Sequence, residues 1–185
     1  MKKLFILTVT TLITSTTFAN SSISLGYAQG SIKEGDKVRG VNAKYTYEIN
    51  DKIGVLTSLT YLKGSKKEVD KAITTNSFID ESQTRYTSLS IGPIYRINDY
   101  ISLYGILGVA KTNTKLSEKS EFPNKQIVVD RESKSSKTAL AYSVGTQVNV
   151  TSNFLVNVGY EGSKVNNGET NKKLNSFVIG LGYKF

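Results

Sequence analysis

Apolar residues recur at every second position between Arg85 and Ile97, with Ile94 as the one apolar residue out of phase. The apolar positions are Leu89, Ile91, Pro93, Tyr95 and Ile97. A period of two places alternate side chains on opposite faces of a β-strand. Asn98 and Asp99 follow, and both residue types tolerate the dihedral angles of a tight turn. Residues 100–109 then alternate more loosely, so the pattern predicts a hairpin.

The same alternation recurs along the chain and predicts eight strands. The two strands of the hairpin are each about as long as a bilayer requires of a tilted strand, roughly 9–11 residues. The expected strands are 22–29, 39–49, 53–62, 85–97, 100–109, 137–150, 153–162 and 174–185.

The connections between these strands alternate in length. Three are short and hold Asn50-Asp51, Asn98-Asp99 and Thr151-Ser152. Four are long and charged, at about 31–38, 63–84, 111–136 and 163–173. Outer-membrane barrels combine an even strand number with short periplasmic turns and long outer loops. We therefore expect an all-β fold, an eight-stranded antiparallel transmembrane β-barrel, over residues 20–185.

A soluble eight-stranded barrel would show the same alternation, with its apolar face turned inward. Three features favour the membrane. One strand face holds almost only large apolar and aromatic residues, the other is polar and rich in glycine, and the chain ends on a strand with Phe185. A barrel strand exposes only alternate residues to lipid, so a long apolar helix is not required.

The first 19 residues are typical of a secretory signal peptide. Lys2 and Lys3 precede a short apolar run over 4–12, and Thr17-Phe18-Ala19 places small residues at a cleavage site. The alternative is a cytoplasmic protein that begins with an accidental apolar run. We expect the mature chain to begin at Asn20 and to lie in the bacterial outer membrane, with its loops outside and its termini in the periplasm.

Composition limits the chemistry. The 185 residues include no Cys, His or Trp. Without Cys there is no disulfide framework or thiolate metal site, and without His the usual Ser–His pair of hydrolases is excluded. Ser88 and Ser90, expected on the inner face, are interpreted as small fillers of the lumen. We therefore expect no enzyme activity, no metal and no cofactor.

The interior of an eight-stranded barrel is just wide enough for side chains, so a filled lumen is expected. Charges in such a space must pair, because an isolated buried charge is costly. Tyr86 and Gln147 should also face inward. A proton or ion relay and a small channel are the alternatives. The predicted polar network consists of Lys44, Glu48, Arg96, Glu161 and Lys184.

The net charge of +9 suggests an anionic partner. The third long segment has six basic and four acidic residues, and Arg39, Arg85 and Lys137 flank the long segments. These cations could bind lipopolysaccharide phosphates, or sulfated glycans and acidic patches of host proteins. Nucleic acid is not expected, because the loops do not interleave aromatic and basic residues. The candidate ligand- or lipopolysaccharide-binding residues are Lys111, Lys115, Lys119, Lys125, Arg131, Lys134, Lys137, Lys164, Lys172 and Lys173.

The third long segment also contains an apolar run, Gln126 to Val129, after Phe122-Pro123. We favour the interpretation that this run extends the neighbouring strands as a hairpin above the membrane. The alternative is an exposed strand edge that pairs with a partner protein.

Three stretches resemble the Ail/Lom (OmpX-like) family of enterobacterial outer-membrane proteins over the whole mature chain. Residues 40–48 read GVNAKYTYE, where Ala43 is smaller than the usual aliphatic residue and Thr46 replaces the family's usual Arg. Residues 92–109 read GPIYRINDYISLYGILGV, and residues 177–185 read FVIGLGYKF, a full match to the family's ending.

This resemblance implies attachment to host cells and extracellular matrix, invasion, and resistance to serum killing. It also implies a C-terminal assembly signal, Phe177, Tyr183 and Phe185, read by the barrel assembly machinery. We expect a monomer that acts as an adhesin. The alternative function is a structural envelope protein that binds lipopolysaccharide without a specific host partner.

Overall fold

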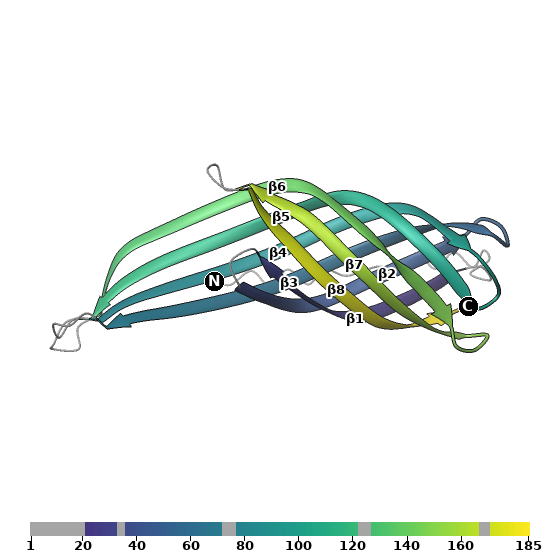
Figure 1. The fold of residues 1–185 in the computed structure, drawn as a ribbon, viewed down its shortest axis with the longest axis horizontal. Coiled ribbons are helices and arrows are strands. Elements are labelled where there is room, and N and C mark those ends of the chain that lie inside the picture. Colours follow the sequence, from purple (N-terminus) through teal and green to yellow (C-terminus); the bar gives the residue numbers. More distant parts are fainter. Residues whose placement is uncertain (1–20, 33–35, 72–76, 122–126, 167–170) are drawn as a thin grey trace, which may run out of the picture.

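The computed structural model describes residues 21–32, 36–71, 77–121, 127–166 and 171–185. Eight strands follow one another in sequence order, and β1 also pairs with β8, so the sheet closes into an antiparallel barrel (Figure 1). This confirms the predicted strand number and antiparallel closure. The strands are β1 (Ser21–Ile32), β2 (Asp36–Glu48), β3 (Ile53–Lys71), β4 (Ser77–Arg96), β5 (Ile101–Glu121), β6 (Ile127–Asn149), β7 (Phe154–Asn166) and β8 (Asn171–Lys184).

The large apolar side chains lie on the outside of the barrel. Leu25 and Leu181, which are paired across β1 and β8, are 68% and 72% exposed. The opposite faces of the same strands bury polar side chains such as Ser24 and Ser176. A soluble barrel would have the reverse arrangement, because water contact with so much apolar surface is unfavourable. The orientation of the faces is therefore that of a barrel surrounded by lipid.

Three four-residue turns connect β2 to β3, β4 to β5 and β6 to β7, and they share one construction. In each, the side-chain oxygen of the second turn residue accepts hydrogen bonds from the backbone N–H groups two and three positions later. These residues are Asn50, Asn98 and Thr151. Such local side-chain bonds are what favours Asn and Thr at turns. The three short turns lie where the sequence predicted them.

The strands continue far into the segments that were predicted as long loops. Most of 63–84 and 111–136 forms ladder pairs, and β5 and β6 are 21 and 23 residues long. This corrects the predicted loop boundaries, including those at 31–38 and 163–173. Backbone ladders form between polar strands as readily as between apolar ones, and alternation of hydrophobicity does not mark their ends. The run Ile127–Val129 lies in β6, as the favoured hairpin interpretation required.

The two central hairpins extend beyond the closed barrel. Pairing of β2 with β3 reaches Arg39 and Lys63, and pairing of β6 with β7 reaches Ala141 and Ser163. Above these pairs β3, β4, β5 and β6 continue as a sheet, which projects past the other hairpins along the long axis (Figure 1). We call the end with these hairpins the hairpin end, and the opposite end the turn end.

The predicted signal peptide, residues 1–19, lies outside the described residues. Within the part of the chain that the structure describes, no helix is long and apolar enough to cross a membrane.

Candidate functional site

A buried carboxylate organises the upper part of the lumen. Glu161 on β7 is 1% exposed, and its Oε1 accepts hydrogen bonds from the hydroxyls of Tyr86, at 2.7 Å, and Ser88, at 2.5 Å. Its Oε2 accepts a bond of 2.7 Å from Thr60. Side chains of the hairpin β3–β4 therefore meet the distant strand β7 at one carboxylate. Ser88, interpreted from the sequence as a filler, is a donor to this carboxylate.

The second charge of the lumen joins the same network through an amide. Lys44 Nζ donates to Asn42 Oδ1 at 2.7 Å, and Asn42 Nδ2 donates to Thr60 Oγ1 at 2.9 Å. The ammonium also lies 5.7 Å from the centre of the Tyr104 ring, within range of a cation–π interaction. Lys44 and Glu161 are thus linked by hydrogen bonds through Asn42 and Thr60.

An apolar layer lies between this network and the turn end, beside the buried polar pair Thr46 and Gln147. It consists of Leu56, Ile94, Tyr104 and Ile106, all buried. The Tyr104 hydroxyl lies against the paired backbones of Gly145 and Gly159, where an added Cβ would come within 2.4 and 2.1 Å of it. Two glycines on the adjoining strands β6 and β7 therefore make room for this ring.

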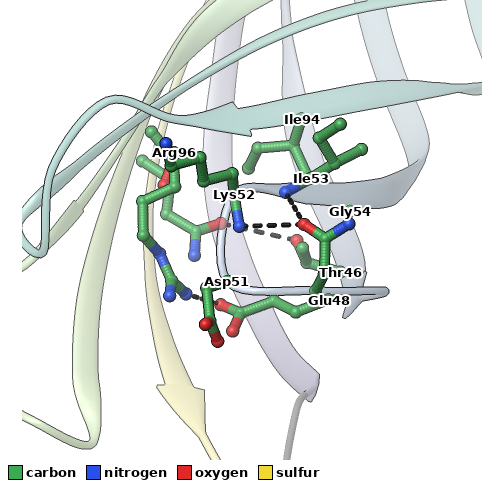
Figure 2. A pocket seen from close by; sticks show the side chains of 11 residues that line it. Thr46, Glu48, Asp51, Lys52, Ile53, Gly54, Ile94 and Arg96 are labelled. Atoms are coloured by element: carbon green, nitrogen blue, oxygen red, sulfur yellow. Dashed lines mark hydrogen bonds and ion pairs between the residues drawn. The ribbon is translucent and has the colours of Figure 1, made fainter.

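Charges close the lumen again at the turn end (Figure 2). Glu48 bonds to Arg96, and Lys184 Nζ lies 2.8 Å from the same carboxylate. The cavity beside them, under the turn that holds Asp51 and Lys52, is about 10 Å³. That is enough for about one water molecule. The structure thus places Lys44 and Glu161 in one lumen network and Glu48, Arg96 and Lys184 in another.

These layers leave little scope for chemistry on a substrate. Ser88 contacts a carboxylate, yet both residues are almost fully buried. Among the described residues, no group of three or more acidic side chains is placed to hold a metal ion. The lumen is built as a filled structural core, and a ligand must be sought on the outside.

Basic side chains gather on the outside of the hairpin end. Acidic residues also lie on the strands of this end: Glu68 and Asp70 on β3, Asp80 and Glu81 on β4, Glu118 and Glu121 on β5, and Asp130 and Glu132 on β6. The exposed basic residues described at the hairpin end are Lys37, Arg39, Lys63, Arg85, Lys111, Lys115, Lys134, Lys137, Lys164 and Lys173.

The structure brings six of the ten predicted ligand-binding cations to this end as exposed side chains. Lys119, Arg131 and Lys172 lie on β5, β6 and β8. Lys125 lies outside the described residues.

Several of these cations lie directly opposite one another on neighbouring strands. Arg39 pairs with Lys63, and Lys63 pairs in turn with Arg85. We call these three residues the rim row. Like charges directly opposite one another on paired strands destabilise a sheet. Sequence reasoning missed the rim row because only the register shows it; Arg39 and Arg85 were noted there only as residues at strand edges.

Two further pairs of this kind lie beside the rim row. Lys115 lies opposite Lys134 on β5 and β6, and Lys164 lies opposite Lys173 on β7 and β8. All four side chains are exposed, and the sequence had marked all four as candidates. We call these the upper pairs.

Two hollows accompany these cations. One, of about 260 Å³, spans β4, β5 and β6 and combines cations with amide and hydroxyl groups. Its lining residues are Gln83, Arg85, Asn113, Thr114, Lys115, Lys134, Ser135 and Ser136. The other, of about 720 Å³, lies where β2 and β3 separate and includes Lys37, Arg39 and Lys63. Both offer several charged donors to an anion, as sulfate and phosphate recognition requires.

The predicted assembly signal lies on the outer face at the end of the chain. Tyr183 contacts Phe154 and Phe185 edge to face, with ring centres 5.6 and 5.3 Å apart. Phe177 makes a similar contact with Tyr160 at 5.4 Å. Phe154, Tyr183 and Phe185 form an aromatic cluster at the turn end, of the kind found at the edges of the apolar band in outer-membrane barrels.

Comparison with known proteins finds relatives of one family along the whole chain. Residues 2–185 match the family model described as Enterobacterial Ail/Lom protein. The chain is 33% identical over 187 residues to the virulence membrane protein PagC of Salmonella typhimurium, covering 97% of this chain and 95% of PagC. It is 36% identical over 172 residues to the attachment invasion locus protein of Yersinia enterocolitica, covering 90% and 86%.

A comparison with solved structures finds the same family. The crystal structure of Ail, the attachment invasion locus protein of Yersinia pestis, in complex with the heparin analogue sucrose octasulfate, aligns with a TM-score of 0.70. The two chains are 34% identical, and the alignment covers 90% of this chain and 98% of that one.

Proposed function

Because this chain belongs to the enterobacterial Ail/Lom family of outer-membrane barrel proteins, we propose that it is an adhesin whose basic hairpin end binds polyanionic ligands on host surfaces. Membership confirms the resemblance seen in the sequence, the transmembrane barrel and the expectation that the chain is not an enzyme. It supports adhesion and virulence in general. The ligand and the residues that bind it are the subject of the proposal.

The observation that carries the proposal is the direct opposition of cations on neighbouring strands. The two upper pairs place four lysine side chains on the outer face of the hairpin end. Paired strands hold the two lysines of each pair close together, so one anionic group of a ligand can contact both side chains. A surface that holds several such pairs is suited to a ligand with repeated negative groups.

A sulfated glycan is the ligand class we favour. Sulfate groups are permanently charged and recur along such a chain, which matches several cation pairs on one face. The hollow lined by Arg85, Lys115 and Lys134 adds amide and hydroxyl donors. The Yersinia pestis relative was crystallised with a heparin analogue, which supports this chemistry for the present chain.

The proposed orientation places the hairpin end outside the cell and the termini in the periplasm, after removal of residues 1–19. Both ends of the described chain lie at the turn end, where Phe185 N donates to Ser21 O. We propose that the protein acts as a monomer and that the barrel assembly machinery reads Phe177, Tyr183 and Phe185 on β8 and at the end of the chain.

The test is heparin binding by the full chain in lipid nanodiscs. A variant with all four lysines of the upper pairs changed to Gln should lose at least about tenfold in affinity. Binding by the natural chain should also weaken steeply as salt rises. Lys52→Gln, an exposed lysine at the turn end, is the matched control. Unchanged heparin binding by the fourfold variant would overturn the proposal, and adhesion and serum survival can be compared in the same strains.

A second candidate function is binding of lipopolysaccharide. The rim row lies two residues beyond the outward-facing pair Val41 and Tyr61, at the edge of the apolar band. Cations in this position meet the phosphates of an anionic leaflet. Changing Arg39 and Lys63 to Gln, which leaves Arg85 in the hollow with Lys115 and Lys134, should reduce binding of lipopolysaccharide and leave binding of heparin largely intact. If this variant lost heparin binding but kept lipopolysaccharide binding, the assignment of the two ligands to the two sites would be wrong.

A further inference from the structure

Three aromatic side chains gather on the outer face of β6, β7 and β8. Tyr160 and Phe177 lie opposite each other on β7 and β8, and their rings meet edge to face with centres 5.4 Å apart. Tyr142 on β6 lies opposite Gly162 on β7. Its ring fills the space that a side chain at residue 162 would take, because an added Cβ would collide with the ring. We call Tyr142, Tyr160 and Phe177 the aromatic patch.

The aromatic patch lies at the border of the apolar band. Phe177 lies opposite Gln29 on β1, and Gln29 lies opposite Arg39 on β2, so this ring belongs to the first polar ladder row of the wall. Its side chain is 70% exposed. Rings at such a border form the aromatic girdle of outer-membrane barrels, and anchoring at the membrane interface is the simpler explanation of their presence. Anchoring does not explain the polar groups that adjoin them.

An amide and two cations lie directly beyond the aromatic patch on the same outer face. Asn175 lies opposite Gly162, and the next outward pair is Lys164 and Lys173. All three polar side chains are exposed. The lysines are two residues beyond Gly162 and Asn175, roughly 7 Å along each strand. A ring-sized ligand on the patch therefore has the amide and both ammonium groups within reach of its substituents.

Acidic residues lie away from this surface. Glu161 on β7 is buried in the lumen, where it is 1% exposed. Asp36 begins β2, two strands from β8, and Asp130 and Glu132 lie on the part of β6 that has no ladder with β7. Glu169 lies outside the described residues. The charged side chains described on the outer face of β7 and β8 are therefore cations.

We propose, resting on the function proposed above, that this surface holds one acidic sugar ring of the host glycan. Lys164 and Lys173 bind its sulfate or carboxylate groups, and the Asn175 amide donates to one of its oxygens. The negative face of an aromatic ring attracts the weakly positive C–H groups on one side of a sugar. Tyr142, seated over Gly162, supplies that face. This surface thus recognises the sugar as well as its charge, which opposed lysines alone do not.

The test compares two polyanions, of which only one contains sugar rings. Heparin oligosaccharides and inorganic polyphosphate are offered to the full chain in phospholipid nanodiscs. Tyr142→Leu should weaken heparin binding at least about threefold and leave polyphosphate binding unchanged, because it removes a ring and no charge. Tyr61→Leu on β3 is the matched control, since Tyr61 and Tyr142 are both outward-facing and 43% exposed. This control should bind both polyanions as the natural chain does.

Unchanged heparin binding by Tyr142→Leu would overturn the proposal. An equal loss with polyphosphate would do the same, since it would indicate a displaced strand and not a sugar contact. The double variant Lys164→Gln and Lys173→Gln should weaken binding of both polyanions. If this double variant loses heparin affinity and Tyr142→Leu does not, the sugar contact fails while the proposed function stands.

Lipopolysaccharide also contains acidic sugars, so it forms the last arm of the test. Tyr142→Leu should bind lipopolysaccharide as the natural chain does. Loss of lipopolysaccharide binding together with unchanged heparin binding would assign the aromatic patch to a sugar of the membrane itself and would exclude the host glycan as its ligand.

Discussion

Tyr86 on β4 donates a hydrogen bond of 2.7 Å to Glu161 on β7, although the two residues are 75 positions apart in the sequence. Both side chains are buried in the lumen. The bond ties two strands that are not neighbours in the sheet, and with Ser88 and Thr60 it makes Glu161 the acceptor of three hydroxyl donors. The barrel is therefore held together across its interior as well as around its wall.

Replacing Glu161 by Leu should destabilise the barrel strongly. Three buried hydroxyls would lose their acceptor, and each unsatisfied group costs about 1–3 kcal/mol. We expect a loss of at least about 3 kcal/mol in the free energy of unfolding, measured by urea titration in lipid vesicles. Glu161→Gln keeps an accepting oxygen and should lose clearly less. Equal stability of the Leu and Gln variants would show that the hydroxyl contacts contribute little.

The pocket for the Tyr104 hydroxyl predicts a strong effect of a single methyl group. In Gly159→Ala the new Cβ would lie 2.1 Å from that oxygen, so ring or strand must move. Such overpacking costs about 1–3 kcal/mol. Gly105→Ala is the matched control, because nothing lies within 4 Å of its Cβ position. Adding Tyr104→Phe should recover part of the loss, and a strictly additive double variant would contradict the contact.

The shared turn construction predicts that its side-chain acceptor stabilises the turn. Asn98→Ala removes the acceptor for two backbone N–H groups, so we expect a loss of about 1 kcal/mol. Asn98→Asp keeps the acceptor and should be close to the natural chain. Asp99→Ala, at the exposed neighbouring position, should change the free energy of unfolding by less than about 0.5 kcal/mol. Thermal unfolding of the three variants in the same vesicles decides the ranking.

The layered lumen predicts that the barrel does not conduct ions. The apolar residues Leu56, Ile94, Tyr104 and Ile106 lie between the two charged networks, and the polar side chains beside them, Thr46 and Gln147, are buried and hydrogen-bonded to each other. Planar-bilayer recordings should therefore show no steady conductance, with a water-filled porin as the positive control. Glu48→Ala disrupts only the turn-end network, and this variant should also show no steady conductance. A stable unitary current through the natural chain would revive the channel alternative.

The sequence by itself determined the local features of this protein. The period of two identified the strands from 22–29 to 174–185, because alternate side chains of a strand must meet different surroundings. Asn50, Asn98 and Thr151 marked the short turns, because their side chains satisfy turn backbone groups. The charge excess and the ending FVIGLGYKF pointed to the family and to an anionic partner.

Only the tertiary structure decided which residues meet across the barrel. Alternation cannot tell the lumen from the lipid face, and it does not give the register that sets Lys63 between Arg39 and Arg85. It also missed the ends of the ladders, so the projecting sheet was expected as loops. Glu161 finds Tyr86 only because closure of β1 on β8 brings distant strands around one narrow interior, and that closure is a property of the whole chain.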